Sequence, residues 1–441
     1  MKELESVPQI RVGIVRSRSV MVTFNGTYCD TQGLGISLSG SNEFKLIEGL
    51  RGWHVVCGKQ QFDDVVLMPE KADGTFTISD VEIGIGFHWD KHENQTFAGG
   101  LGFAIENEQL WAVNHIDVES YLRCVIASEM SATSDLELLK AHAVTSRSWL
   151  MAQVWGKGKF RGTESRETEG RKIVWRDRED HALFDVCADD HCQRYQGLGR
   201  VSNAKVDKAI AATRGMVLTY DGEVCDARFS KCCGGRTEVF ETCWGNEGHA
   251  YLTSFHDAMM PDRDYPTAIV TERDAEDWIM GSPEAFCNTA DAQALSQVLN
   301  DYDQTTRDFY RWSVTMTGEE LGQLILEKGG EDIGEVRELT PLHRGPSGRI
   351  DLLRIVGSKG TLEIGKELEI RRLLSKTHLY SSAFVVSTSP SGRRFTLHGA
   401  GWGHGVGLCQ IGAAVMAQRG FSFRGILYHY YRKALLERVW E

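Results

Sequence analysis

The chain has 441 residues, enough for two or three domains and a large core. A hydrophobic content of 41% and a charged content of 25% are ordinary for a globular protein and exclude large-scale disorder. The formal net charge of −12 argues against nucleic acid as a partner, because phosphate binding needs a basic face, whereas a neutral polymer such as a glycan stays compatible. No apolar run approaches the length of a membrane span.

The N-terminus lacks the charged and apolar regions of a signal peptide, so we expect either a cytoplasmic protein or a chain that begins after a removed leader. The eleven cysteines include a vicinal pair, Cys232 and Cys233. An odd number cannot form a fully paired disulfide framework, and a mixture of buried thiols with a metal site is favoured.

The first part of the chain is predicted to be rich in short β-strands bounded by turns, at residues 10–15, 19–24, 74–78, 81–85 and 110–113. The hydrophobic period then changes to that of a helix over residues 118–130. Ser134 and Glu137 are spaced as a capping box, which predicts a second helix to about Val154.

The rest of the chain mixes both periods. The charged segment 156–180 lacks periodicity and is predicted to be a surface loop, whereas Asp221-Gly222 predicts the turn of a hairpin. Residues 256–335 are acidic and weakly patterned, with helices expected near 289–302 and 318–328, and β-strands return over 336–387. Two helices are expected at the end, one from Gln410 to Gly420 and one through 428–431. These elements predict an α+β fold of mixed sheets with a helical catalytic segment.

The most unusual stretch is glycine-rich, with glycine at every second position from 399 to 407. If this backbone is extended, one face is bare and the other carries His398, Trp402, His404 and Val406, as expected where a ligand comes close. The alternative is a glycine-rich turn with Trp402 in the core. No frame supplies G-x-G-x-x-G and no Walker lysine follows, so no nucleotide cofactor is expected.

Glu129 is the carboxylate that stands out, because it lies three and four residues after Ile126 and Val125 in the apolar stripe of its helix. A carboxylate against apolar neighbours loses hydration and its pKa rises, which suits protonation of a glycosidic oxygen near neutral pH. The alternative is a solvated glutamate at the rim of the helix.

Two cysteine motifs carry possible chemistry. Cys187, His191 and Cys192 lie within six residues and are of the types that zinc prefers, although they could equally be buried thiols beside a turn-capping histidine. Cys232 and Cys233 precede two glycines, where an apolar thiol lining a tight turn is favoured over a reactive one.

Together these segments resemble the SpoIID/LytB family, which contains sporulation lytic transglycosylases and amidase enhancers of the bacterial cell wall. The similarity extends from about residue 99 to the end, so residues 99–441 are interpreted as the core, with 256–335 a variable insert and 1–98 a β-rich N-terminal extension. Its landmarks, in the family's order, are Tyr121-Leu-Arg-Cys-Val-Ile-Ala-Ser-Glu129-Met130, residues 138–147, His191-Cys-Gln-Arg-Tyr195, residues 227–238, Trp244-Gly245, Ser347-Gly-Arg349 and residues 403–412.

The resemblance implies that Glu129 is the catalytic acid of a lytic transglycosylase acting on peptide-stripped glycan strands of peptidoglycan. It further implies a structural zinc at Cys187, His191 and Cys192, an envelope location, and a cell-wall amidase as a partner. The residues expected to bind substrate are Arg147, Gln193, Tyr195, His398, Trp402, His404 and Gln410.

The chain departs from the family where Ser131 replaces a proline, where Cys232 and Cys233 replace serines, and where Cys409 and Ile411 flank Gln410. Glu129, the residue that matches the family's catalytic acid, is kept, whereas residues of the neighbouring motifs differ from the family's pattern. The competing hypotheses are a non-catalytic wall-binding amidase enhancer, which would tolerate loss of the acid, and a zinc hydrolase using the cysteine and histidine cluster.

Overall fold

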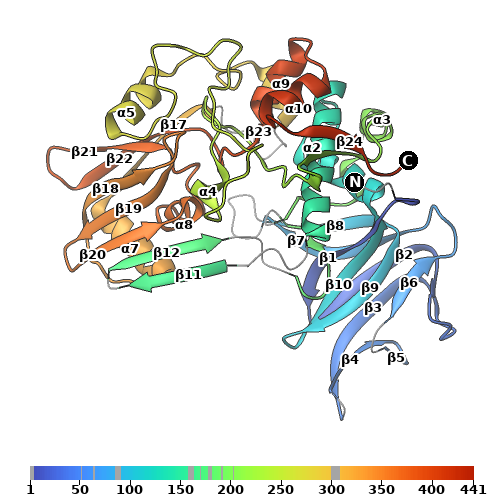
Figure 1. Cartoon of the computed structure of the whole chain (residues 1–441). Coiled ribbons are helices and arrows are strands. Elements are labelled where there is room, and N and C mark those ends of the chain that lie inside the picture. The colour runs from blue at the N-terminus through green and yellow to red at the C-terminus, as the bar shows by residue number, and fades with distance from the viewer. Residues whose placement is uncertain are drawn as a thin grey trace. The chain divides into compact units, whose positions relative to one another are not determined.

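The computed structural model describes residues 4–50, 52–62, 65–84, 91–156, 163–168, 170–176, 181–189, 192–201, 203–298 and 308–441. The fold is α+β, as expected (Figure 1). The chain divides into two compact units, each assembled from segments far apart in sequence. Unit 1 contains Met1–Val154, His181–Met216 and Arg438–Glu441, and unit 2 contains Trp155–Asp180 and Val217–Glu437.

Unit 1 is built on one large, mainly antiparallel sheet in the order β13-β1-β10-β9-β6-β2-β3-β4-β5, with β7 pairing with β2 and β8. The predicted boundary at residues 98 and 99 falls inside this sheet, between β8 and β9, rather than between units. The strands are β1 (Gln9–Ser17), β2 (Ser19–Asp30), β3 (Ser37–Gly49), β4 (Gly52–Cys57), β5 (Gln60–Phe62), β6 (Val66–Pro69), β7 (Thr75–Ile83), β8 (Lys91–Ala98), β9 (Gly100–Glu106), β10 (Gln109–Asp117) and β13 (Val186–Cys187).

The strands expected at 74–78 and 81–85 are, over the described residues, the single strand β7. Asp80 lies within it at a φ of 58°, and the pairing of β7 with β8 shifts register between Ile78 and Val81. One extra residue therefore bends the strand without ending it, which the sequence pattern presents as a break.

The helices of unit 1 are α1 (Val118–Glu129), α2 (Leu136–Trp155), the 3-10 turn η1 (Leu198–Arg200) and α3 (Ala204–Ala212). Asp117 caps α1 by accepting a hydrogen bond from the amide of Ser120. The cap of α2 lies one residue later than predicted, because the Asp135 carboxylate accepts from the amide of Glu137 while the Ser134 hydroxyl donates to the carbonyl of Ser131.

The described residues of unit 2 form four smaller sheets, ordered β11-β12-β20-β19-β18, β17-β22-β21, β15-β14-β24 and β16-β23. The predicted Asp221-Gly222 hairpin is confirmed between β14 and β15, with positive φ at both turn residues. The strands are β11 (Thr163–Thr168), β12 (Arg171–Arg176), β14 (Met216–Tyr220), β15 (Glu223–Val224), β16 (Phe229–Ser230), β17 (Arg311–Thr317), β18 (Val336–Arg344), β19 (Ile350–Gly357), β20 (Thr361–Gly365), β21 (Phe384–Thr388), β22 (Arg394–Ala400), β23 (Leu408–Cys409) and β24 (Leu435–Arg438).

The prediction of a loop over 156–180 is wrong for its described part. Residues 163–168 and 171–176 form the antiparallel pair β11-β12, and β12 pairs in parallel with β20. The strand signal was hidden because half of the side chains in these two strands are charged, and Val174 is their one buried residue among those described.

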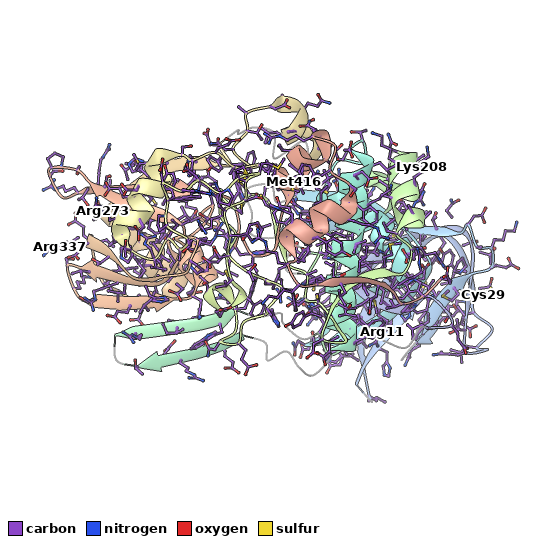
Figure 2. The ribbon with its side chains drawn as sticks, turned by 45° about the horizontal axis from the view of Figure 1, so that its top comes forward. Arg11, Cys29, Lys208, Arg273, Arg337 and Met416 are labelled. Carbon is purple, nitrogen blue, oxygen red and sulfur yellow. The ribbon has the colours of Figure 1, made fainter. Side chains whose placement is uncertain are left out.

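The helices of unit 2 are α4 (Phe240–Cys243), α5 (Glu272–Gly281), α6 (Ala292–Val298), α7 (Gly318–Gly329), α8 (Glu367–Leu373), α9 (Gln410–Gln418) and α10 (Phe423–Tyr430). Leu321 and Ile325 of α7 and Ile370 of α8 join the core formed by β18, β19 and β20. Met416, labelled in Figure 2, is a buried side chain of α9. Across the described part of the chain, no helix has both the length and the hydrophobicity needed to cross a bilayer.

Candidate functional site

Glu129 is the last residue of α1 and is 9% exposed. The stripe that precedes it is fully buried at Leu122, Val125 and Ile126. The backbone amide of Arg194 donates a hydrogen bond to Glu129 Oε1 at 3.1 Å. The carboxyl group is therefore held at the end of a buried helix against the segment that begins at Cys192.

That segment is joined to α1 and α2 by its own side chains and backbone. The Gln196 amide donates to Ser128 Oγ at 3.1 Å, and Gln193 joins Tyr121 of α1 to the Ser146 carbonyl of α2. Tyr195 stacks on Tyr121 with ring centroids 4.9 Å apart.

Gln193 and Tyr195, both expected to bind substrate, lie in the protein interior. They are 1% and 0% exposed, and the Tyr195 hydroxyl donates to Asn114 Oδ1 at 2.6 Å. As placed, their side chains support the backbone that contacts Glu129.

Arg147 is also an interior residue, with 0% exposure. Its guanidinium donates to Glu119 Oε2 at 2.6 Å and to the Met216 carbonyl at 3.0 Å. Glu119 Oε1 in turn accepts from the Gly215 amide and the Trp440 indole. Arg147 therefore joins α2 to α1 and, through Glu119, to two more segments of unit 1.

A cluster of metal-ligand type lies in the same unit. The ligand atoms of His181, Cys187 and Cys192 all lie within 4.8 Å of one another, with Cys192 Sγ 3.6 Å from His181 Nε2. His191, the predicted histidine ligand, lies outside the described residues. His181 was missed because it is separated from Cys187 by five residues without a recognised motif.

The cysteine cluster and Glu129 both influence the pKa of the same buried residue, Tyr121 of α1. The pKa of the Tyr121 phenol is raised well above its ordinary value by burial, and the thiol groups of Cys192 and Cys187 and the Glu129 carboxyl add to that effect. The Tyr121 ring therefore lies near Cys187, Cys192 and the Glu129 carboxyl.

The expectation of an extended bare face along the glycines is wrong beyond Ala400, the last residue of β22. Gly401, Gly403, Gly405 and Gly407 all have left-handed φ values between 72° and 95°. A Cβ at Gly401 would lie 2.7 Å from the Cys232 carbonyl, and one at Gly405 would overlap a guanidinium. Glycine is required here because the chain's own segments approach closely, so no ligand is needed to explain the pattern.

This segment is held by an arginine that belongs to another landmark of the resemblance. Arg349 donates to the Gly403 carbonyl at 3.0 Å and to Ser347 Oγ at 2.8 Å, and Ser347 Oγ donates to Glu238 Oε2 at 2.6 Å. Burial raises the pKa of Glu238, partly offset by these hydrogen bonds. Three sequence landmarks thus meet in one buried polar cluster in unit 2.

The two histidines that were expected to share one face, His398 and His404, have different surroundings from each other in unit 2. His404 accepts from the Val406 amide at Nδ1, and burial together with the cations of Arg228 and Arg349 lowers its pKa well below the ordinary value. His398 is a partly buried residue of β22, the middle strand of its sheet.

Trp402 is partly exposed and belongs to an aromatic group. Its ring lies 4.4 Å from Tyr380, which is also partly exposed, and 4.7 Å from Phe309, measured between centroids. Gln410, in contrast, is the buried first residue of α9.

The vicinal cysteines are buried, and the thiol of Cys233 meets the carboxylate of Asp257 at 3.4 Å. His429 contacts the other oxygen of Asp257 at 2.9 Å. A carboxylate rather than an imidazole therefore adjoins the thiol, which is not the pairing that activates a cysteine nucleophile.

Residues 106–220 match the Stage II sporulation protein (SpoIID) family, and residues 238–407 match a domain family of unknown function, DUF8618. The chain is 26% identical to Stage II sporulation protein D of Bacillus amyloliquefaciens over 73% of this chain and 74% of that protein. It is 25% identical to Stage II sporulation protein D of Bacillus subtilis (strain 168), over 73% of this chain and 74% of that one.

It is also 25% identical to the amidase enhancer of Bacillus subtilis (strain 168), over 70% of this chain and 39% of that protein. The matched family region contains α1, Glu129, Arg147 and the Cys187–Cys192 segment. Residues 106–220 therefore form a SpoIID family domain, and the similarity to relatives named Stage II sporulation protein D extends over most of the chain.

Proposed function

We propose that this protein acts on the bacterial cell wall as a lytic transglycosylase of peptide-stripped glycan strands, with Glu129 as the single acid and base. The observation that carries the proposal is the placement of Glu129, buried at the end of α1 in the SpoIID domain and hydrogen-bonded by the Arg194 amide. The relatives' names support a role in the envelope, which is where its substrate would lie.

Both protonation states of Glu129 have support in this position. The helix C-terminus carries partial negative charge and the carboxyl group is buried, and both features oppose its ionisation. The N–H of Arg194 points at Oε1 and stabilises the carboxylate once the proton has left. A group that gives a proton and then takes one back needs both kinds of support.

The reaction then proceeds in two proton transfers. Glu129 donates its proton to the glycosidic oxygen between N-acetylmuramic acid and N-acetylglucosamine, and that C–O bond breaks as positive charge develops on the muramic ring. The carboxylate removes the proton of the muramic 6-hydroxyl, whose oxygen bonds to the anomeric carbon and closes the 1,6-anhydro ring. No water is consumed, so no second carboxylate is needed to activate one.

Trp402 and Tyr380 are a pair of neighbouring, partly exposed aromatic residues in unit 2, and they are proposed to stack against sugar rings of the glycan. His398 remains a candidate for positioning the substrate. The side chains of Arg147, Gln193 and Tyr195 are instead proposed to act indirectly, by holding α1 and the Arg194 amide.

A zinc ion fits the cluster of His181, Cys187 and Cys192, whose two sulfurs and imidazole are the donors that zinc prefers. We propose that these residues bind it as a structural brace that fixes the start of the segment donating to Glu129. A structural ion would supply folding energy and no chemistry to the bond being cleaved.

The test is mass spectrometry of glycan strands, with and without stem peptides, after incubation with the wild-type protein and with Glu129→Gln. Anhydro-muramic ends made only by the wild type would support the proposal, and Glu137→Gln, a partly exposed glutamate of α2, is the matched control that should stay active. Reducing ends would indicate hydrolysis instead.

The second candidate is a non-catalytic amidase enhancer, favoured by the relative that carries this name. It predicts glycan binding without cleavage, and equal stimulation of a cell-wall amidase by the wild type and by Glu129→Gln. Cleavage lost in that variant while stimulation persists would show that the two activities coexist.

A further inference from the structure

A second cluster of metal-ligand type lies in unit 2, where the cysteines depart from the family's pattern. Cys233, Asp257, Cys287 and Cys409 come from four separate segments and are 2%, 0%, 1% and 0% exposed. Their ligand atoms all lie within 4.8 Å of one another. Convergence of three thiols and one carboxylate in a buried place is not expected of thiols that serve only as apolar packing.

The separations between these atoms match a four-coordinate ion. With Zn–S near 2.3 Å and Zn–O near 2.1 Å, tetrahedral geometry places two sulfurs about 3.8 Å apart and a sulfur and an oxygen about 3.6 Å apart. Cys233 Sγ lies 3.6 Å from Cys287 Sγ and 3.4 Å from Asp257 Oδ2. A disulfide between Cys233 and Cys287 would need sulfurs about 2 Å apart.

The groups around these four residues orient them as an outer shell orients metal ligands. His429 Nε2 lies 2.9 Å from Asp257 Oδ1, and the Tyr430 hydroxyl donates to Oδ2 at 3.2 Å. The amides of Cys233 and Gly412 donate to Cys409 Sγ at 3.2 and 3.4 Å. Oriented carboxylates and thiolates that accept amide hydrogen bonds are typical of metal sites.

Electrostatics also favours a cation at this point. A fully buried carboxylate against three sulfurs has high desolvation cost, which a divalent ion bound between them offsets. Sulfur-rich tetrahedral donor sets select zinc over magnesium or calcium, which prefer oxygen. All four positions are taken by protein, so the ion would be structural.

We propose that Cys233, Asp257, Cys287 and Cys409 bind a structural zinc ion that joins the β16-β23 region to the segments preceding α5 and α6. The site is independent of the proposed zinc at His181, Cys187 and Cys192 and of any activity of Glu129.

The test is metal analysis by inductively coupled plasma mass spectrometry of the full chain purified without chelators. The double variant Cys187→Ser/Cys192→Ser removes the other cluster and should keep about one equivalent of zinc. Adding Cys287→Ser or Cys409→Ser should abolish it, whereas adding Cys225→Ser, a buried thiol of unit 2 outside the cluster, should leave it unchanged.

Because the ligand variants could fail to fold, X-ray absorption of the zinc-loaded Cys187→Ser/Cys192→Ser protein provides a second measurement. Three sulfurs at about 2.3 Å and one oxygen at about 2.0 Å would support the assigned ligands, and four sulfurs would overturn the role of Asp257. Metal-free protein, iron with inorganic sulfide, or a Cys233–Cys287 disulfide found by peptide mapping without reductant would each overturn the proposal.

Discussion

Replacing Arg147 by methionine tests whether this residue holds the fold or binds the substrate. Methionine has a similar length and no charge, so it fills the volume but leaves Glu119 as a buried carboxylate without its ion pair. Removing one partner of a buried pair costs about 3–5 kcal/mol in the free energy of unfolding. For a unit of this size that corresponds to a fall of roughly 10 °C in melting temperature.

Urea unfolding of the full chain, monitored by circular dichroism, measures the free energy of unfolding. Calorimetry on the same protein measures the melting temperature. Arg123→Met is the matched control, because Arg123 lies on α1 in an exposed ion pair with Asp207, 41% and 50% exposed, where the expected cost is below about 1 kcal/mol. The double variant Arg147→Met/Glu119→Gln should be less destabilised than the sum of its parts, since it leaves no buried charge unpaired.

A melting temperature unchanged in Arg147→Met, combined with weaker glycan binding, would refute this reasoning. It would restore the substrate-binding role that the sequence alone predicted for Arg147. A large loss of stability with unchanged glycan affinity in the folded fraction is the result expected from the structure.

Three further predictions concern other parts of the chain. Gly405→Ala should destabilise unit 2 by more than the roughly 1–2 kcal/mol that left-handed backbone strain alone would cost, because the added Cβ would overlap Arg349. The control is Gly392→Ala, since Gly392 has a φ of +70° and open space around it, so that this variant measures the backbone strain alone in the same urea assay. Burial, together with neighbouring cations, lowers the pKa of His378 from 6.5 to about 4, so the folded state takes up fewer protons than the unfolded one. The free energy of unfolding should therefore fall as pH decreases from about 6.5 to about 4, and this slope should be weaker in His378→Gln; an equal slope in the variant would contradict the assignment. Cys192→Ser should lower the zinc content by about one equivalent and slow glycan cleavage without abolishing it, with metal content and rate measured on the same sample. Complete loss of cleavage in a folded variant would instead favour a zinc hydrolase.

Regular segments could be predicted because their side chains record their surroundings. The helix at 118–130 showed its buried face at Leu122, Val125 and Ile126, and the hairpin at 221–222 showed its turn chemistry. The hairpin β11-β12 could not be predicted, since its charged side chains obscure a pattern that backbone pairing with β20 decides.

The candidate site was predictable in part, from one apolar stripe and from the resemblance. Glu129 was found from its stripe and the family motif, but its contact with the Arg194 amide joins residues 65 positions apart. The glycines between 401 and 407 were misinterpreted because alternation looks the same whether the backbone is extended or left-handed. The cluster of Cys233, Asp257, Cys287 and Cys409 could not be predicted, because its residues come from four segments far apart in sequence and form no short motif.

The last residues of the sequence complete the first unit. Trp440 is fully buried and donates to Glu119, and the Val439 amide donates to the carbonyl of Gly215. On the ribosome, more than two hundred residues separate the emergence of Gly215 from that of Trp440, which is roughly 10 to 45 seconds of synthesis. During that time unit 1 lacks a buried indole of its core, and Glu119 of α1 lacks the hydrogen bond from Trp440, so unit 1 should reach its full stability only after these residues are synthesised.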